Sequence, residues 1–271
     1  MKAREVIDAI EKAAPRPMTP FAMNFTHFGD EEREVKKIVT TFMVTAEVAR
    51  KAAEWGADMI VTHEPTFPFA RPGDEAGAKW LAEDPVVNGK KKILADAGIV
   101  VWQFHDGMHA ARPDMIYVGW NELMGWRSYN VPGPNNHIYH IPKTTLGELV
   151  ALLKEKLDMP SIRIIGDPSI PVERVGVLVG GGSTGLGDPN MPAKTIQYEN
   201  LDTLICGEIV EYGICEYVRD GVQLGLNRSA IMIGHERTEE WGMKVLPRWL
   251  KRILPEMEIT FIEAGEPFNY L

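Results

Sequence analysis

Short apolar runs alternate with amphipathic helical patterns along this chain, and this alternation constrains its fold more than any other feature. In the first half, strand-like runs at 35–45, 58–62 and 98–104 are separated by helical patterns at 46–57 and 76–98, the second broken near Pro85. Apolar runs of this length, separated by helices, are typical of βαβ units that build a largely parallel sheet.

The second half repeats the pattern after a stretch at 129–144 that is rich in Pro, Gly and Asn and indicates a transition between modules. Strand-like runs follow at 161–167, 174–179, 202–208, 229–234 and 258–264. We therefore predict an α/β protein of two modules with mainly parallel mixed sheets. Residues 1–130 and 229–271 are expected to form the first module, which carries the metal ligands, and residues 131–228 the second.

Side chains that bind metals follow three of the predicted strands: His63 and Glu64, then His105, Asp106 and His109, then His235, Glu236 and Glu239. Ligands of parallel α/β sheets bind beyond the carboxyl ends of the strands, so a metal site is expected in the cleft there. His235 and Glu239 are four residues apart at a helix start and can project from one face. Imidazole and carboxylate ligands suit zinc, manganese, iron or nickel, with one or two ions per chain.

Several of these residues have simpler interpretations. Asp106 could cap a turn, and Glu236 could be a first-turn acid favoured by the helix dipole; the roles of His105 and Asp106 stay open.

The glycine loop at 180–187 lacks the lysine of a P-loop, so close backbone approach is preferred over phosphate binding. Cys206 is expected to be a small buried hydrophobe. Glu208, at a strand end, is a further candidate, whereas three histidines are expected to be structural or at the surface: His27, His137 and His140.

The composition and net charge of the chain limit the classes of partner that it is expected to bind. The 271 residues carry a formal net charge of −9, with a pI near 5.4, which argues against nucleic-acid or anionic-membrane binding. Two cysteines are too few for a disulfide framework. The first residues form a charged amphipathic pattern without the apolar core of a signal peptide, and no apolar run is long enough to cross a bilayer. A cytoplasmic protein is expected.

Taken in order, "THEP" (62–65), "HDGMH" (105–109) and "GHERTE" (234–239) resemble the THHP-, HTNLD- and GHYATE-like segments of the NGG-interacting-factor-three-like family. The strand "DTLICGE" (202–208) is similar to a TGE-type segment of the same family. These dinuclear metal centre hexameric proteins are often named GTP cyclohydrolase 1 type 2. The resemblance implies a homohexamer and metal ligands at five positions: His63, Glu64, His109, His235 and Glu239.

Two departures from the family pattern matter. Glu64 replaces the second histidine of THHP, and His109 replaces the aspartate that ends HTNLD. Three histidines and two carboxylates remain, but a neutral imidazole cannot bridge two metals, so Glu64 or Glu239 would bridge instead. We predict a two-metal site with rearranged bridging, with a single-metal site as the alternative. The stretch "MTPFAMNFTHFGDEE" (18–32) also differs from the family's tryptophan-and-glycine stretch, which bears on substrate specificity.

The function expected from these residues is metal-dependent hydrolysis of a small molecule, with a nucleotide, phosphoester or amide as substrate. A bound ion would activate water, and Glu64 or Glu208 could accept its proton as the catalytic base. One alternative is a non-catalytic metal-binding or regulatory scaffold in a ring-shaped oligomer. Another is a nucleotide-binding module that uses the glycine loop.

Overall fold

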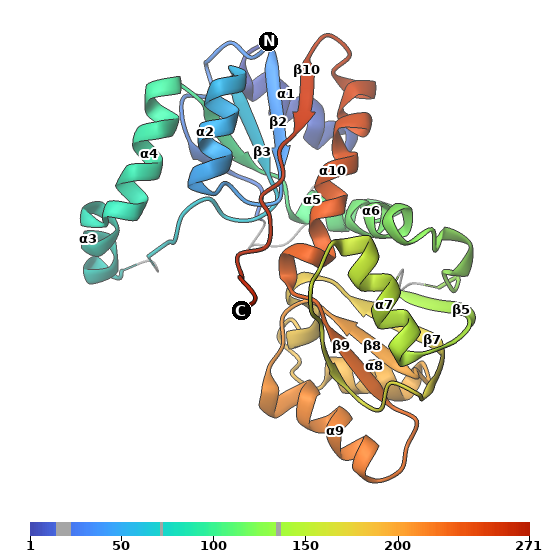
Figure 1. Cartoon of the computed structure of the whole chain (residues 1–271). Helices are drawn as coiled ribbons and strands as arrows, with labels where there is room; N and C mark the ends of the chain where they lie inside the picture. Colours follow the sequence, from blue (N-terminus) through green and yellow to red (C-terminus); the bar gives the residue numbers. More distant parts are fainter. Residues whose placement is uncertain (15–22, 71–72, 134–136) are drawn as a thin grey trace. The chain divides into compact units, whose positions relative to one another are not determined.

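The computed structural model describes residues 1–14, 23–70, 73–133 and 137–271 (Figure 1). Its contacts divide the chain into two compact units. The first unit comprises Met1–Ile116 and Gly242–Gly265, and the second comprises Tyr117–Trp241 and Glu266–Leu271. The division falls inside two helices, α6 (Met115–Met124) and α10 (His235–Ile253).

The first unit contains a five-stranded mixed sheet with the order β1-β4-β3-β2-β10. Its four parallel strands are β2 (Lys37–Thr41), β3 (Met59–Thr62), β4 (Val100–Gln103) and β10 (Glu258–Phe261), and β1 (Thr26–Phe28) pairs antiparallel with β4. In the register, Thr41 lies opposite Thr62 and Thr62 opposite Gln103. Residues that follow β3 and β4 therefore emerge at one edge of the sheet.

The helices that lie wholly within the first unit are α1 (Ala3–Ala13), α2 (Ala46–Trp55), α3 (Glu75–Glu83), α4 (Pro85–Ala97) and the short α5 (Asp106–Ala110). The predicted break near Pro85 is confirmed, because Asp84 ends α3 and its side chain caps α4 by accepting a hydrogen bond from the Val87 amide. Residues of α2 and α4 pack with one face of the sheet in a core that includes Ala52, Leu94 and Ile60.

The second unit contains a five-stranded mixed sheet with the order β5-β7-β8-β9-β6. The central strands β7 (Pro171–Leu178), β8 (Thr203–Cys206) and β9 (Ser229–Met232) are parallel, and the edge strands β5 (Ile138–Thr145) and β6 (Arg163–Ile165) are antiparallel to their neighbours. Its helices are α7 (Leu146–Leu157), α8 (Met191–Tyr198) and α9 (Glu216–Gln223), with 3₁₀ turns at Arg127–Tyr129 and Gly180–Thr184 and a π-helical turn at Glu211–Cys215.

The predicted fold class, two α/β modules with mixed sheets, is confirmed. The division of the chain differs from the predicted one, which placed residues 229–271 in the first module. Strand β9 pairs with β8 and β6, and residues up to Trp241 group with the second unit. The apolar pattern of a strand identifies the strand but carries no information about which neighbours it pairs with.

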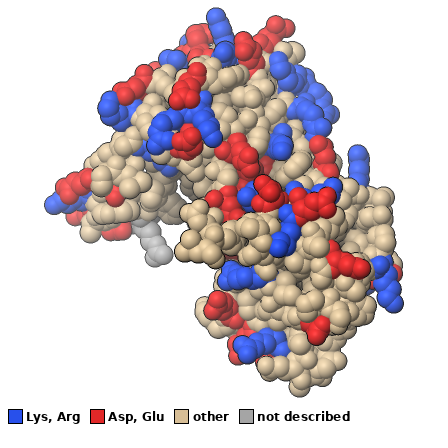
Figure 2. All heavy atoms as spheres, viewed as in Figure 1, with Lys and Arg blue, Asp and Glu red and all other residues tan. Residues whose placement is uncertain are grey.

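Two further features bear on partners. No helix among the described residues combines the length and the apolar character needed to cross a membrane. On the face shown in Figure 2, lysine and arginine side chains are interspersed with aspartate and glutamate side chains on each unit. Charges of both signs are therefore mixed on this face of the described chain.

Candidate metal centre

Three histidine rings converge at one edge of the first unit's sheet. His63 follows β3 directly, and His105 and His109 follow β4. One ring nitrogen from each lies within 4.8 Å of those of the other two. The ring centroids of His63 and His105 are 4.5 Å apart, those of His63 and His109 5.2 Å, and those of His105 and His109 4.9 Å. The aligned ends of β3 and β4 bring these residues together although His63 and His105 are 42 positions apart in the sequence.

The backbone of His63 is fixed by hydrogen bonds to both neighbouring strands. Its amide lies 3.1 Å from the carbonyl oxygen of Phe42 after β2, and its carbonyl oxygen accepts a hydrogen bond of 2.9 Å from Nε2 of Gln103 in β4. Oε1 of Gln103 in turn lies 2.9 Å from Nε2 of His27. His27, expected to be structural, thus belongs to the network that holds the strand end.

Carboxylates contact Nδ1 of two of the three rings. Oδ1 of Asp106 lies 2.8 Å from Nδ1 of His105, and Oδ2 of Asp114 lies 3.0 Å from Nδ1 of His109. Each carboxylate also accepts a backbone amide: Asp106 accepts that of Met23, and Asp114 that of Ile116. Asp114 was not identified from the sequence, where its only signal is a position five residues after His109.

Burial keeps His105 in its neutral form. Burial, together with the nearby His63 and His109 rings, lowers the pKa of His105 to about 4, although Asp106 and Glu64 act in the opposite direction. A neutral imidazole whose Nδ1 is bonded to a carboxylate presents Nε2 as a lone-pair donor. Oε1 of Glu64 lies 3.7 Å from Nε2 of His105, so this carboxylate belongs to the same group of side chains.

A second group of candidate ligands lies in the second unit, at the start of α10. Nε2 of His235 lies 2.9 Å from Oε2 of Glu239 one helical turn later, and Nδ1 of His235 lies 2.9 Å from Oε1 of Glu208, which follows β8. Glu239 is buried, whereas the Glu208 side chain is 55% exposed. His235 is therefore held between two carboxylates through its two ring nitrogens.

The glycine loop packs its backbone against this second group. Gly180 has φ +50°, and a Cβ there would lie 2.2 Å from Oε1 of Glu239 and 2.6 Å from Nε2 of His235. The Gly180 amide donates to Oγ1 of Thr238, and the Glu208 amide donates to the Gly180 carbonyl oxygen. A Cβ at Gly207 would lie 2.3 Å from that same carbonyl oxygen. These contacts account for glycine at both positions by close backbone approach.

Glu236 occupies a different environment from its neighbour His235. Its carboxylate is buried, and Nε of Arg237 lies 3.4 Å from its Oε2 and 3.8 Å from Oε2 of Glu266. Burial and the adjacent Glu240 carboxyl raise the pKa of Glu236 to about 9, so the group is neutral at pH 7. Glu236 contributes to a buried carboxyl cluster of the second unit.

The remaining candidates lie outside these two groups. His140 pairs with Glu173 at 3.1 Å on the surface, and burial lowers the pKa of His137. Cys206 is fully buried, as expected for a small hydrophobe, and burial raises the pKa of its thiol to about 12. Of the divergent stretch 18–32, residues 18–22 lie outside the described residues.

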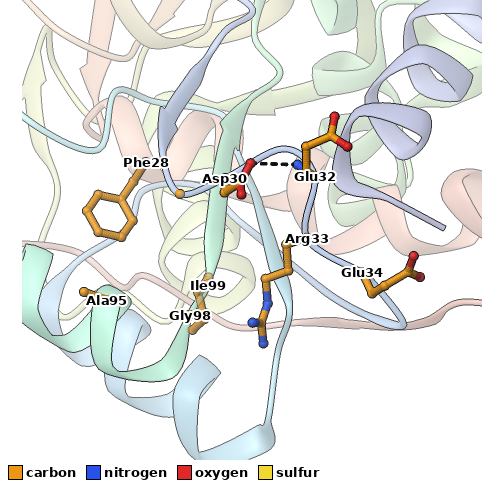
Figure 3. A pocket seen from close by; sticks show the side chains of 9 residues that line it. Phe28, Asp30, Glu32, Arg33, Glu34, Ala95, Gly98 and Ile99 are labelled. Atoms are coloured by element: carbon orange, nitrogen blue, oxygen red, sulfur yellow. Dashed lines mark hydrogen bonds between the residues drawn. The ribbon is translucent and has the colours of Figure 1, made fainter.

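A surface hollow lies elsewhere in the first unit, lined by residues that include Phe28, Arg33 and Gly98 (Figure 3). Gly98 and Ile99 directly precede β4, whereas His105 follows it, so this hollow lies at the opposite end of that strand from the histidine rings. Its lining combines apolar side chains such as Phe28 and Ile99 with surface charges and includes no histidine or cysteine. It adds no group to the candidate metal centre.

The fold and the two ligand groups define an α/β protein with candidate histidine and carboxylate ligands for metal ions at the ends of its strands. A sequence profile of the Duf34/NIF3 (NGG1p interacting factor 3) family matches residues 1–267. The chain belongs to this family, which confirms the resemblance of the sequence motifs.

Curated relatives match all or nearly all of the chain. A protein of Clostridium perfringens named "GTP cyclohydrolase 1 type 2 homolog" is 26% identical over 283 residues, covering 100% of each chain. A protein of the same name from Methanocaldococcus jannaschii is 24% identical and covers 97% of this chain and 100% of its own.

Solved structures confirm the fold. A Bacillus cereus protein related to NIF3 superposes with a TM-score of 0.76 at 14% identity, covering 100% of this chain and 99% of the other. The reduced form of HcgD from Methanocaldococcus jannaschii superposes with a TM-score of 0.67 at 21% identity, covering 96% and 97%.

Proposed function

We propose that this protein is a metal-dependent hydrolase that binds one or two divalent ions through five residues: His63, Glu64, His109, His235 and Glu239. The observation that carries the proposal is the convergence of imidazole nitrogens beside a carboxylate at the end of the first unit's sheet. The joining of this group with His235 and Glu239 in one centre rests on the family resemblance of the motifs. The same resemblance supports two ions, with a single ion as the alternative.

The side chains present fit a divalent transition metal. Metal-binding histidines usually donate their second ring N–H to a carboxylate or carbonyl, which fixes the tautomer and the ring orientation. Asp114 stands in this position behind His109, and Glu208 behind His235. Imidazole with carboxylate is a donor set that suits zinc, iron, nickel and manganese.

A divalent ion held by these residues would supply Lewis acidity, which acidifies water and polarises a carbonyl or phosphoryl oxygen. Glu64 is placed to accept a proton, because its carboxylate is partly exposed beside the histidine rings. Glu208 is the second candidate base, and its contact with His235 gives it a further task, holding that ring in one orientation.

A nucleotide or another phosphoester is the proposed class of substrate, an inference from the cyclohydrolase name of the relatives. The acidic chain would meet an anionic substrate at the metal centre, where bound cations reverse the local charge. GTP is therefore the first substrate to test, followed by a generic phosphoester such as p-nitrophenyl phosphate.

The test compares metal-free protein, prepared with a chelator, with protein reloaded with zinc, manganese, iron(II) or nickel. We expect turnover of GTP or the phosphoester only after reloading, and loss of turnover together with weakened metal binding in Glu64→Gln, which removes both a proposed ligand and a proposed base. His140→Gln, at the surface of the second unit, is the matched control and should behave as the wild type. Metal-loaded protein that turns over none of these substrates would instead favour a metal-binding or regulatory scaffold. Nucleotide binding that survives chelation would favour the nucleotide-binding module.

We further propose that the protein acts in the cytoplasm as a homohexamer on a small-molecule substrate, without nucleic acid or membrane as partner. The oligomeric state is implied by the family resemblance. Light scattering coupled to size exclusion tests it, and a monomer of 30.3 kDa at micromolar concentration would contradict it.

A further inference from the structure

We infer that His105 is a metal ligand, and that with His63 and His109 it forms a three-imidazole subsite made entirely by the first unit. This inference rests on the proposed metal centre and changes its ligand set, since the motif resemblance places no ligand at His105. The subsite needs no residue of the second unit, so its occupancy is separable from that of His235 and Glu239.

The spacing of the rings suits a single cation. Zinc binds histidine nitrogen at about 2.0–2.1 Å, which places the nitrogens of a tetrahedral site roughly 3.4 Å apart. In the first unit, one nitrogen of each ring lies within 4.8 Å of the other two. Binding of one ion would therefore require each pair of nitrogens to approach by at most about 1.4 Å.

The carboxylates that contact Nδ1 of two rings determine which ring nitrogens would be available to an ion. Asp106 contacts Nδ1 of His105, and Asp114 contacts Nδ1 of His109, so each ring directs Nε2 away from its carboxylate. Nε2 of His105 faces the side of Glu64, 3.7 Å from its carboxylate. His105 thus has the same orienting arrangement as His109, a ligand implied by the motifs.

Hydrogen bonds that involve backbone amides hold both His105 and its partner Asp106 in place. Its amide donates to Oδ1 of Asn24, and the second oxygen of Asp106 accepts the Met23 amide. Asp106 is therefore an orienting group for the His105 ring, in addition to being the first residue of α5. A ring that only filled space would not require a carboxylate fixed at both of its oxygens.

Three imidazole nitrogens with one nearby carboxylate define the chemical class of the ligand. Such a donor set favours zinc, nickel, cobalt or iron(II) over magnesium and calcium, which prefer oxygen ligands. The subsite should therefore select a nitrogen-binding ion even when magnesium is in large excess.

The test measures cobalt(II) binding to metal-free protein by visible absorption and metal content by elemental analysis. His105→Gln should weaken binding at the first unit by at least the 10–100-fold typical of lost supporting groups, and Asp106→Asn by about 10–100-fold. His140→Gln, a surface histidine of the second unit, should leave affinity and spectrum unchanged. His235→Gln should still bind one ion per chain. An unchanged cobalt spectrum and affinity in a folded His105→Gln variant would overturn the inference.

A second measurement avoids dependence on the folding of the His105 variant. X-ray absorption of the zinc-loaded His235→Gln protein should give three imidazoles around the ion, and two or fewer would overturn the inference. Failure of the proposed metal centre has a different signature, because the wild type would then bind no transition ion in any of these experiments. Binding by the wild type with an unaffected His105→Gln variant rejects the ligand role of His105 alone.

Discussion

Nδ1 of His235 lies 2.9 Å from Oε1 of Glu208, a carboxylate that comes from a different strand end of the same sheet. The contact fixes which ring nitrogen of His235 is directed toward Glu239. It gives Glu208 an orienting role that the sequence did not indicate, beside the role of base proposed for it.

The variant Glu208→Gln should weaken metal binding by the His235 group about 10–100-fold, the usual effect of removing an orienting carboxylate. Competition with a chromophoric chelator measures this affinity. Glu216→Gln, an exposed carboxylate in α9, is the matched control and should change nothing. A Glu208→Gln protein with wild-type affinity but reduced turnover would assign Glu208 to proton transfer alone.

The variant Gly180→Ala should impair the same ligand group by steric overlap. The added Cβ would lie 2.2 Å from Glu239 and 2.6 Å from His235, and φ +50° adds strain of about 1 kcal/mol. Gly187→Ala is the control, because Gly187 also has positive φ (+100°) but nothing within 4 Å of a Cβ. Both variants should lose some thermal stability, and only Gly180→Ala should lose metal affinity. Equal affinities in the two would contradict the close approach.

The variant Gln103→Leu should destabilise the first unit by about 1–3 kcal/mol, since the His63 carbonyl oxygen and the His27 ring both lose a buried hydrogen-bond partner. Chemical denaturation of metal-free protein measures the effect. Gln223→Leu, an exposed glutamine at the end of α9, should stay within about 0.5 kcal/mol of the wild type. Similar losses in both would show that the network at the end of β3 adds little stability.

The two cysteines should differ in reactivity toward alkylation. Burial raises the pKa of Cys206 to about 12, so at pH 8 the thiolate that reacts is almost absent. Burial also raises the pKa of Cys215, so this thiol should react more slowly than a free cysteine. Because Cys215 is partly exposed, it should nevertheless react before Cys206. Mass spectrometry after iodoacetamide treatment distinguishes the sites, with denatured protein as the control in which both react. Equal labelling in the native protein would contradict the burial of Cys206.

The sequence was sufficient to predict the two α/β modules and the three segments that bear candidate ligands, because apolar runs and turns mark strand ends locally. Strand β5 was not predicted. Its residues include Pro142 and fall in a stretch read as a transition, yet β5 lies at the edge of its sheet, where a proline is tolerated. The short α5 is too brief for its period to be recognised.

The residues that hold the candidate ligands in place could not be predicted from the sequence. Asp114, Asn24 and Gln103 act through contacts that depend on the pairing of β4 with its neighbours. The place of His105 beside His63 likewise depends on the register between β3 and β4. Local patterns contain no information about register, so these relationships required the structure.

The position of β10 at the edge of the first sheet has a consequence during translation. β10 pairs with β2, from Glu258 opposite Lys37 to Phe261 opposite Thr40. The ribosome therefore completes residues 117–241 while the outer edge of β2 in the nascent chain still lacks its neighbour. The strands that precede the histidine rings, β3 and β4, have by then been synthesised together with their flanking strands β2 and β1, so the β2 edge is the last whose partner is made.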